Sequence, residues 1–395
     1  MKIGFIWHCV YPWDVRLEKI MKACAEQGHE IVLVCKGRHG LPRRETVGDF
    51  RIHRVWPGSR LPRAFAKALI YPLFFNPAWI YATWKVLREE KVDLIMVRDL
   101  PLALMAGLLG FLLRKPVMMD MAENYPAALM AYENPLYKPF LFANGWLPKK
   151  LERISLKTLD HVLVVTEEQG ERLKEMGVEA RRISLVGNTP ERAFFARNGA
   201  GDRPGTNGRT DLLFVGKLDA HRGTELAIRA LSQLTAEFPK LNLVLVGDGS
   251  EKDKLGELAR TLNLADRVEL PGWIDPRQVP DYIQKSSICL IPHLRSEHTD
   301  TTLPNKLFDY MAFSKPVVAA DCRPLERVIE ETGCGLTFKS GDAADLALAL
   351  RRILRDPDKD QKGRNGKKAV EEKYNWGIDR RTLLETIYKV GGARA

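Results

Sequence analysis

A chain of 395 residues is longer than one hydrophobic core usually organises, so two domains are expected. Apolar residues make up 45% of the chain and charged residues 28%, which excludes a disordered or fibrous protein. The net charge of +11 is uneven: residues 1–190 hold 28 Lys and Arg against 20 Asp and Glu, and the remainder holds 33 against 30.

The N-terminal apolar run is too short for a signal peptide, and we expect a buried strand there. Residues 1–195, the predicted first domain, alternate short β-rich runs with helical patterns. The expected strands are Ile3–Cys9, Ile31–Cys35, Leu94–Val97, Val117–Met119 and Val162–Val165, and the expected helices include Asp14–Glu26 and Glu168–Met176. This alternation predicts a parallel sheet with helices on both faces. The apolar run 101–113 is too short to span a bilayer and is typical of a core helix.

The six cysteines are scattered, without a C-x-x-C pair. Cys9, Cys35 and Cys289 lie in apolar, strand-like runs. We therefore expect buried, reduced thiols of a cytoplasmic protein, and neither a disulfide framework nor a zinc site.

Residues 51–88 contain seven basic and no acidic residues, interleaved with eight aromatic ones. This pattern fits an anionic membrane surface or a nucleic acid. No recognised nucleic-acid-binding module accompanies the charge, so we expect no nucleic acid, and Pro72 and Pro77 argue against a spanning segment. The alternative is a pair of helices with core aromatic residues and solvated basic ones.

Residues 192–210 are polar, rich in Gly and Arg, and aperiodic, which indicates a linker. Strands and helices then alternate again over 206–375, the predicted second domain. The expected strands are Leu212–Val215, Leu243–Val246, Val268–Leu270, Ile288–Ile291 and Val317–Ala319, and the expected helices are Thr224–Thr235, Glu251–Leu262, Val279–Lys285 and Lys306–Phe313. The chain therefore predicts an α/β fold of two doubly wound units, which bind ligands at the carboxyl ends of their strands.

The first strand end of the second unit, 215–223, is a candidate phosphate site. Gly216 and Gly223 let the backbone approach a ligand closely. Lys217 and Arg222 supply cations beside a helix N-terminus, which itself favours an anion. The alternative is a surface loop with two solvated charges.

Two further strand ends carry glycine. Gly247 and Gly249 match the first two glycines of a dinucleotide fingerprint, but Lys252 occupies the third place. The segment 270–274 ends in Trp273 and Ile274, and the indole is expected either near a nucleobase or in the core.

The segment 299–318 is the most informative one. Thr301 and Thr302 are suited to cap a helix beginning near Pro304, and Asp309 lies one to two turns inside, able to accept hydrogen bonds from ribose hydroxyls. A plain amphipathic helix does not explain this polar cap followed by Pro-Asn-Lys.

This segment resembles the signature of retaining family-4 glycosyltransferases of the GT-B fold, in the branch that reads P-N/S-K-L-F-D/E-Y-M-A-x-G-K-P-V. The turns at Gly216, Gly247 and Gly272 follow in the family's order and spacing. The resemblance implies two Rossmann-like domains facing across a cleft, with a C-terminal helix, here 376–392, that packs back on the first domain.

The resemblance also implies roles for residues of the second domain. Lys217 and Arg222 would neutralise the diphosphate of a nucleotide sugar, the co-substrate, and stabilise the departing nucleotide. Asp309 occupies the second acidic position of the family's E-x7-E motif and would hold the ribose. The donor site is completed by Gly216, Gly247, Trp273, Ile274, Thr301, Thr302, Leu303 and Lys306. Thr301 stands where the first acid is expected, with Glu297 and Asp300 as nearby substitutes.

The acceptor side departs from the family pattern. Ala122 occupies the place where a histidine is usual, so Glu123 and Asp99 are the candidates beside the acceptor hydroxyl, with His8 as a further one that is more often structural. The glycine-rich first turn common in the fold is also missing. We expect a glycan or lipid-linked acceptor and a cytoplasmic protein that can lie on the inner face of the membrane.

No metal or cofactor is expected, because the D-x-D at 356–358 fits a helix cap. The resemblance implies metal-independent transfer of a hexosyl or N-acetylhexosaminyl group in polysaccharide or glycoconjugate synthesis. Two other functions are alternatives to this one. One is a catalytically degenerate GT-B subunit, motivated by Ala122 and Thr301. The other is a nicotinamide-dependent oxidoreductase, disfavoured because neither first turn carries G-x-G-x-x-G.

Overall fold

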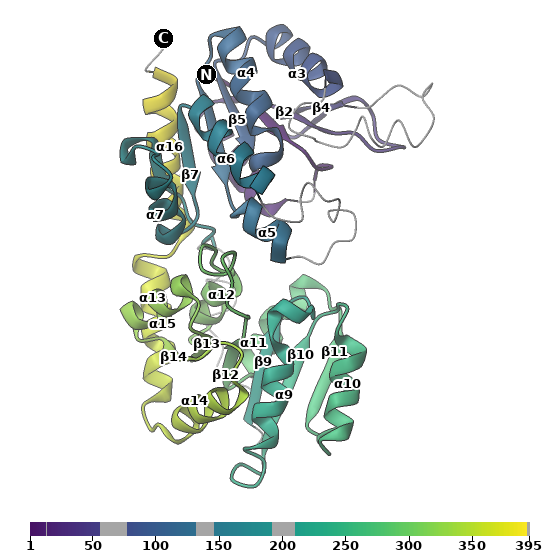
Figure 1. The fold of residues 1–395 in the computed structure, drawn as a ribbon, viewed down its shortest axis with the longest axis vertical. Coiled ribbons are helices and arrows are strands. Elements are labelled where there is room, and N and C mark those ends of the chain that lie inside the picture. Colours follow the sequence, from purple (N-terminus) through teal and green to yellow (C-terminus); the bar gives the residue numbers. More distant parts are fainter. Residues whose placement is uncertain (13, 56–76, 132–145, 192–209, 393–395) are drawn as a thin grey trace. The chain divides into compact units, whose positions relative to one another are not determined.

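The computed structural model describes residues 1–12, 14–55, 77–131, 146–191 and 210–392 (Figure 1). By its internal contacts the chain divides into two units, Met1–Asn188 with Asp379–Ala395, and Thr189–Ile378. Most of the expected linker 192–210 lies outside the described residues; its last residue, Thr210, opens the first strand of the second unit.

The first unit is built on an eight-stranded sheet in the order β3-β4-β2-β1-β5-β6-β7-β8. The strands are β1 (Lys2–Trp7), β2 (Glu30–Lys36), β3 (Arg44–Val47), β4 (Phe50–Val55), β5 (Leu94–Arg98), β6 (Val117–Met121), β7 (His161–Val164) and β8 (Ile183–Leu185). All neighbours pair in parallel except β3 and β4, which form an antiparallel hairpin at the edge. The purely parallel sheet predicted from the sequence is therefore wrong at this edge, where the mostly exposed β3 shows no apolar alternation.

Helices accompany this sheet (Figure 1). They are α1 (Val15–Ala25), α3 (Pro77–Glu89), α4 (Ala103–Leu113), α5 (Tyr125–Ala131), α6 (Trp146–Thr158), α7 (Glu167–Glu175) and α16 (Trp376–Gly392), with 3-10 turns at Leu100–Leu102 and Ala180–Arg182. Trp79 of α3 and Leu109 of α4 join strand residues such as Val97 in one hydrophobic core. From Asp379 onward α16 belongs to this unit, and its Leu383 and Ile387 are fully buried.

The second unit contains a six-stranded, wholly parallel sheet in the order β11-β10-β9-β12-β13-β14. The strands are β9 (Thr210–Val215), β10 (Leu241–Val246), β11 (Val268–Gly272), β12 (Ile288–Ile291), β13 (Val317–Ala320) and β14 (Gly335–Phe338). The helices are α9 (Thr224–Ser232), α10 (Lys252–Thr261), α11 (Val279–Lys285), α12 (Lys306–Ala312), α13 (Arg323–Thr332), α14 (Ala343–Arg355) and α15 (Lys359–Glu372), with 3-10 turns at Ala220–Arg222 and Pro276–Gln278.

In both sheets the first strand of the unit lies in the middle and later strands extend outward on either side of it. This order is that of a doubly wound, Rossmann-like fold, so the prediction of two such units is confirmed. The strand order reverses between β1 and β5 in the first unit and between β9 and β12 in the second. Ligands of such sheets bind beyond the carboxyl ends of these strands.

Two sequence expectations about burial need correction. Cys9 follows the end of β1 and is exposed, whereas the other five cysteines are buried. The run 101–113 does form the core helix α4, but Phe111 and Leu112 in its last turn are 80% and 56% exposed. Among the described residues, no helix combines the length and apolar character needed to cross a bilayer.

Candidate functional site

Two glycines shape the strand ends at the switch point of the second unit. Gly216 follows β9 with φ of 145°, and a Cβ there would lie 2.6 Å from the Lys306 ammonium. Gly247 follows β10 with φ of 139°, and a Cβ there would lie 1.9 Å from the carbonyl oxygen of Gly216. The positive φ at both positions, together with the close packing of Gly247 against the Gly216 carbonyl, requires glycine there.

Arg222 and Lys306 are the cations gathered at this switch point. Arg222 ends the 3-10 turn after β9, and its Nη1 lies 3.2 Å from Nε2 of His293, which follows β12. The Arg222 Nε is buried without a hydrogen bond. The Lys306 Nζ, at the start of α12, lies 3.9 Å from the ring centroid of Phe214. Lys217, the other cation predicted on this turn, is exposed.

The pKa of Lys306 is lowered well below its usual value. Burial of the ammonium is the main cause, the positive charge of Arg222 adds to it, and Asp309 opposes the shift. A buried cation with a depressed pKa is a cation that lacks a sufficient counter-charge. An anion bound beside Lys306 would favour its charged form, so the site is suited to a negatively charged ligand.

Three histidines that the sequence analysis did not single out surround Arg222. Burial is the main cause that lowers the pKa of His221 and of His298 to about 4, and the positive charge of Arg222 is the second cause. Burial, followed by Lys306 and Arg222, lowers the pKa of His293 well below 6.5. All three imidazoles are therefore neutral at pH 7 and add no positive charge. His221 lies on the charged turn 215–223, and His293 and His298 come just before the polar segment 299–302; these positions were the one signal in the sequence.

The predicted cap of α12 by Thr301 and Thr302 is wrong. The N-cap of α12 is Asn305, which makes no side-chain capping bond. Thr301 Oγ1 instead donates to the carbonyl oxygens of Glu297 and His298, at 3.0 and 3.1 Å, and Thr302 Oγ1 donates to that of His298 at 2.9 Å. Threonine hydroxyls close local turns readily, and this loop uses them that way.

The two acidic substitutes for Thr301 differ. Asp300 accepts hydrogen bonds from Arg295 Nε and from the backbone N–H of Arg323, both at 3.0 Å, so its two oxygens hold the loop against the start of α13. Glu297 is exposed on the same loop. Of the pair, Glu297 is the more exposed residue.

The other predicted donor residues lie at neighbouring positions of the same unit. Asp309 is partly exposed one turn into α12, within electrostatic reach of Lys306. Ile274 and Leu303 are partly buried against the core. Trp273, after β11, is 72% exposed, which excludes a place in the core.

The switch point of the first unit is held by a buried ionic network that the sequence did not reveal. The Arg98 guanidinium, at the end of β5, pairs with Asp14 and Asp120 at 3.1 Å and with Asp99 at 3.3 Å. Arg16 of α1 pairs with Asp120 at 2.7 Å and donates to the carbonyl oxygens of residues 186 and 187. The network fixes the ends of β5 and β6 side by side.

Asp99 has a strained backbone with φ of 60° and ψ of 176°. Its N–H donates to the carbonyl oxygen of Asp120 at 3.0 Å, and its Oδ1 accepts from the Ala122 N–H at 3.1 Å. Such a conformation costs about 1–3 kcal/mol in a residue other than glycine and is found mainly at functional sites.

Burial raises the pKa of Asp99 to about 6, with Arg98 opposing the shift and Asp120 and Glu123 adding to it. Burial would also raise the pKa of Asp120, but Arg16 and Arg98 hold it below its usual value. Asp99 is thus the carboxyl of this group that can exchange a proton near neutral pH. Glu123, the other predicted candidate, is partly buried next to it.

His8 follows β1 at the same edge. Burial, followed by Arg98 and Lys36, lowers the pKa of His8 to about 4, so the imidazole is neutral at pH 7. Its ring stands edge-on to Tyr125 at a centroid distance of 6.3 Å, and its Nδ1 is buried without a hydrogen bond.

The structure describes part of the basic aromatic stretch 51–88 and all of the D-x-D segment 356–358. Of the stretch 51–88, residues 56–76 lie outside the described residues; Trp79 is fully buried, and Tyr81 is 64% exposed. Asp356 accepts a hydrogen bond from the backbone N–H of Asp358 at 2.8 Å, just before α15. Among the residues that the structure describes, no three His, Cys, Asp or Glu side chains are grouped to hold a metal ion.

Two family models match the chain, one for each half. The Glycosyl transferase 4-like domain matches residues 14–189, and Glycosyl transferases group 1 matches residues 203–369. The first match leaves out β1 but covers the other strands of the first sheet, and the second match covers every strand of the second sheet with its switch point.

Characterised relatives are glycosyltransferases. The 2-deoxystreptamine glucosyltransferase of Streptomyces kanamyceticus is 24% identical over 87% of this chain and 90% of its own. The phosphatidyl-myo-inositol mannosyltransferase of Propionibacterium freudenreichii subsp. shermanii is 25% identical over 89% of this chain and 84% of its own. The match to alpha-D-kanosaminyltransferase of S. kanamyceticus, at 27% identity, spans 48% of this chain and less than half, 44%, of that relative.

Solved structures of similar fold extend over the whole chain. Sucrose-phosphate synthase from Thermosynechococcus elongatus superposes with a TM-score of 0.77 at 20% identity over 100% of both chains. The Anabaena protein HepE, solved in complex with UDP, gives 0.72 at 14% identity over 98% of this chain and 100% of its own. The two doubly wound sheets, the two family matches and these folds together show that the chain belongs to the family-4 glycosyltransferases of the GT-B fold.

Proposed function

We propose that this glycosyltransferase takes its sugar from a nucleotide diphosphate held by the second unit and transfers it, with retention of configuration, to an acceptor held by the first. The observation that carries the donor assignment is the pair Arg222 and Lys306, two poorly compensated cations at the switch point of a Rossmann-like sheet. The UDP in the similar structure of HepE supports a nucleotide-diphosphate donor here.

The chemistry follows from these charges. As the bond between the sugar and the diphosphate breaks, negative charge grows on the leaving phosphate, and fixed cations stabilise that charge most when they need no reorganisation. Arg222 and Lys306 would stabilise the charge on the leaving phosphate. Lys217 lies on the exposed side of the turn that carries Arg222. We propose that these side chains do the work that a divalent metal does in other transferases.

Asp99 is proposed to take the proton of the acceptor hydroxyl, because its pKa of about 6 leaves it mostly ionised at neutral pH. Its strained backbone, held by Ala122 and Asp120, keeps the carboxylate at the end of β5. Glu123 is a further carboxylate within electrostatic reach of Asp99.

The test is a donor panel of UDP-, GDP- and ADP-linked hexoses and N-acetylhexosamines, with nucleotide release as the readout and glycans and lipid-linked sugars as acceptors. We expect release with one donor class, at the same rate in the presence of EDTA, and a product with the donor's anomeric configuration by NMR. No release with any donor would refute catalysis. A rate that falls with EDTA would refute metal independence alone.

A degenerate, non-catalytic subunit is the second candidate, favoured by the commitment of the Thr301 hydroxyl to the loop backbone where the family has an acid. Nucleotide binding without transfer, unchanged by Asp309→Ala, would identify it.

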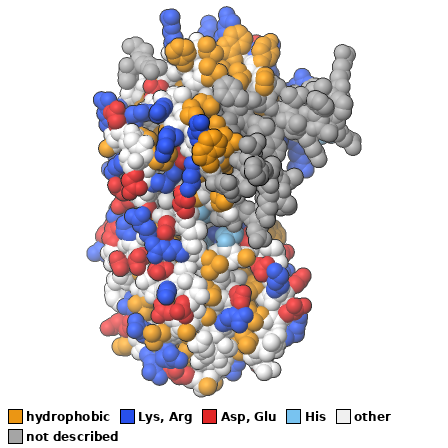
Figure 2. Space-filling model, in the orientation of Figure 1, with side chains coloured by type: hydrophobic (Ala, Val, Ile, Leu, Met, Phe, Trp, Pro, Cys, Tyr) orange, Lys and Arg blue, Asp and Glu red, His pale blue; other side chains and the backbone are white. Residues whose placement is uncertain are grey.

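We also propose that the acceptor is lipid-linked and that the first unit lies on the inner membrane face. The relative that is a phosphatidyl-myo-inositol mannosyltransferase supports such an acceptor. Exposed Phe111 and Leu112 of α4 supply an apolar contact, and the adjoining α6 exposes Lys150, Arg153 and Lys157. Figure 2 shows hydrophobic and basic side chains next to one another over these helices. Each basic residue near an anionic surface is worth about 1 kcal/mol.

Sedimentation with phosphatidylcholine vesicles, with and without phosphatidylglycerol, tests this surface. We expect binding only with the anionic lipid, lost in Phe111→Ser/Leu112→Ser. Leu348→Ser, an exposed leucine on α14 of the second unit, is the matched control. Equal binding of all variants, or none by the wild type, would overturn the assignment.

A further inference from the structure

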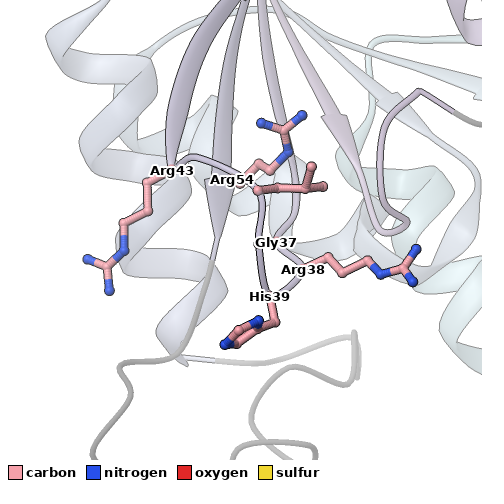
Figure 3. A pocket seen from close by; sticks show the side chains of 7 residues that line it. Gly37, Arg38, His39, Arg43 and Arg54 are labelled. Atoms are coloured by element: carbon pink, nitrogen blue, oxygen red, sulfur yellow. The ribbon is translucent and has the colours of Figure 1, made fainter.

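A pocket outside the site described so far lies beyond the carboxyl end of β2. It is lined by the turn Gly37–Leu41 and by Arg43 and Arg54 of the β3–β4 hairpin (Figure 3). A second hollow shares Arg38, His39 and Arg54 and continues to residues 10–12, after β1. The two hollows together form one groove at the edge of the sheet, which we call the arginine pocket.

The basic residues of this pocket differ from their neighbours in how they are paired. On the outer parts of the hairpin, Arg44 pairs with Glu89 at 3.2 Å, and Arg51 pairs with Glu30 and with Glu90. In the pocket, Arg38 and Arg43 make no side-chain hydrogen bond or ion pair with any residue that the structure describes.

Arg54 is the buried member of the pocket. Its guanidinium donates to the Pro42 carbonyl oxygen at 3.0 Å and pairs with Glu45, and its Nε is buried without a hydrogen bond. Glu45 is the one carboxylate among the residues lining the two hollows. Three arginines against one carboxylate leave the groove with a net positive charge, which is the complement of an anionic group.

The strand order fixes the distance from this pocket to the proposed base. β2, β1 and β5 are consecutive in the sheet, so their carboxyl ends, which lead to Arg38, His8 and Asp99, are successive points on one edge. Neighbouring strands are about 4.8 Å apart, which places the ends of β2 and β5 about 10 Å apart. A sugar ring alone is shorter than this separation, so the phosphate that it carries and the reach of an arginine side chain are needed to bridge it.

We infer that the arginine pocket binds a phosphate group of the acceptor while the acceptor hydroxyl lies at Asp99. The inference rests on the proposed function, because it takes Asp99 as the acceptor end. Guanidinium groups suit phosphate because their N–H groups match its oxygens in pairs. The acceptor class is therefore a phosphorylated sugar, either free or carried on a lipid phosphate.

The test follows backbone amide resonances by NMR during a titration with inorganic phosphate. We expect the amides of Gly37 and Gly40 to shift in a saturable manner. The double variant Arg38→Gln/Arg43→Gln should weaken this binding at least about tenfold, as expected for lost hydrogen bonds to a charged group. Arg44→Gln, an exposed arginine of the same hairpin, should leave it unchanged. Shifts that do not saturate, or equal affinity of the double variant and the wild type, would overturn the inference.

Two further titrations distinguish the sources of the phosphate. Glucose 6-phosphate represents a free sugar phosphate, and dihexanoylphosphatidic acid represents a lipid phosphate. Tighter binding of either one than of inorganic phosphate supports the pocket and names its source. For the sugar phosphate, a shift of the Ala122 amide, which donates to Asp99, reports that the ring reaches the base. If neither compound shifts Gly37 and Gly40, the assignment to an acceptor phosphate is refuted.

The same spectra separate this inference from the proposed function. The Gly216 amide reports nucleotide binding in the second unit. If UDP- and GDP-sugars leave Gly216 unshifted while phosphate shifts Gly40, the donor assignment fails and the arginine pocket stands.

Discussion

The central strands of the two units have the same order, and both units place charged residues at the switch point of the sheet. The charges are paired in the first unit and poorly compensated in the second. At the switch point of the second unit, Arg222 and Lys306 are surrounded by neutral histidines, and Asp309 only partly opposes the lowered pKa of Lys306. At that of the first unit, Arg16 and Arg98 are bound to carboxylates in a closed network. Unmatched cations are suited to hold an anion, whereas a matched network can tune one of its own acids for proton transfer.

The largest expected effect is that of Asp99→Asn, which removes the proposed base. We expect kcat to fall by about 10²–10⁴-fold. Because the pKa of Asp99 is raised to about 6, wild-type activity should rise with pH through about 6 and then level off, and the variant should lose this limb. The pH–rate profile measures both the fall in kcat and the loss of the acidic limb.

Melting temperatures separate a catalytic role of Asp99 from a structural one. Ionising a buried carboxyl whose pKa is raised opposes folding above that pKa, so without a structural role Asp99→Asn should melt no lower than the wild type at pH 7. A variant that melts lower and keeps the acidic limb of the profile would mean that the network merely supports the fold.

Arg16→Ala tests whether the first unit depends on its matched charges. Removal of one partner leaves Asp120 buried with less compensation, which costs about 3–5 kcal/mol. Denaturant unfolding monitored at the first unit should show this loss, while Arg153→Ala, an exposed arginine of α6, should not. An unchanged midpoint would show that water replaces the guanidinium without penalty.

Arg222→Ala tests the unmatched cations of the second unit. Loss of one fixed group that stabilises the leaving charge costs about 10²–10³-fold in kcat. Stability should change little or improve, because a poorly compensated cation is removed. Lys217→Ala, on the exposed part of the same turn, is the matched control and should cost far less. Equal losses for the two variants would contradict the distinction between the partly buried Arg222 and the exposed Lys217.

The smallest effect is expected at Trp273, an exposed indole after β11. If it stacks on the donor base, Trp273→Ala should raise the donor KM by the equivalent of about 0.5–1.5 kcal/mol and leave kcat unchanged. Steady-state kinetics with varied donor concentration checks this, and an unchanged KM would remove Trp273 from the site.

The sequence predicted those features that local residues determine. The glycine turns after β9 and β10 depend on the positive φ of the glycines themselves, and the alternation of strands and helices predicted the central strands of both sheets. The pairing of Arg222 with His293 joins residues 71 positions apart, and that of Arg16 with Asp120 joins residues 104 apart. No local pattern selects such partners, so the histidines and the buried network emerged only from the fold.

The same limit explains the errors. Thr301 and Thr302 precede a helix, as caps do, but their hydroxyls bond back to the carbonyls of a turn that the sequence pattern did not show. The strand β3 was missed because it is exposed along most of its length and carries no apolar period.

The helix α16 has a consequence for the order in which the protein folds. Its buried Leu383 and Ile387 complete the first unit, but the ribosome makes them only after the whole of the second unit. At 5–20 residues per second, the interval between Asn188 and Asp379 lasts roughly 10–40 s. During that time the nascent N-terminal half exposes the apolar surface that α16 later covers, which makes it a natural client for chaperones during translation.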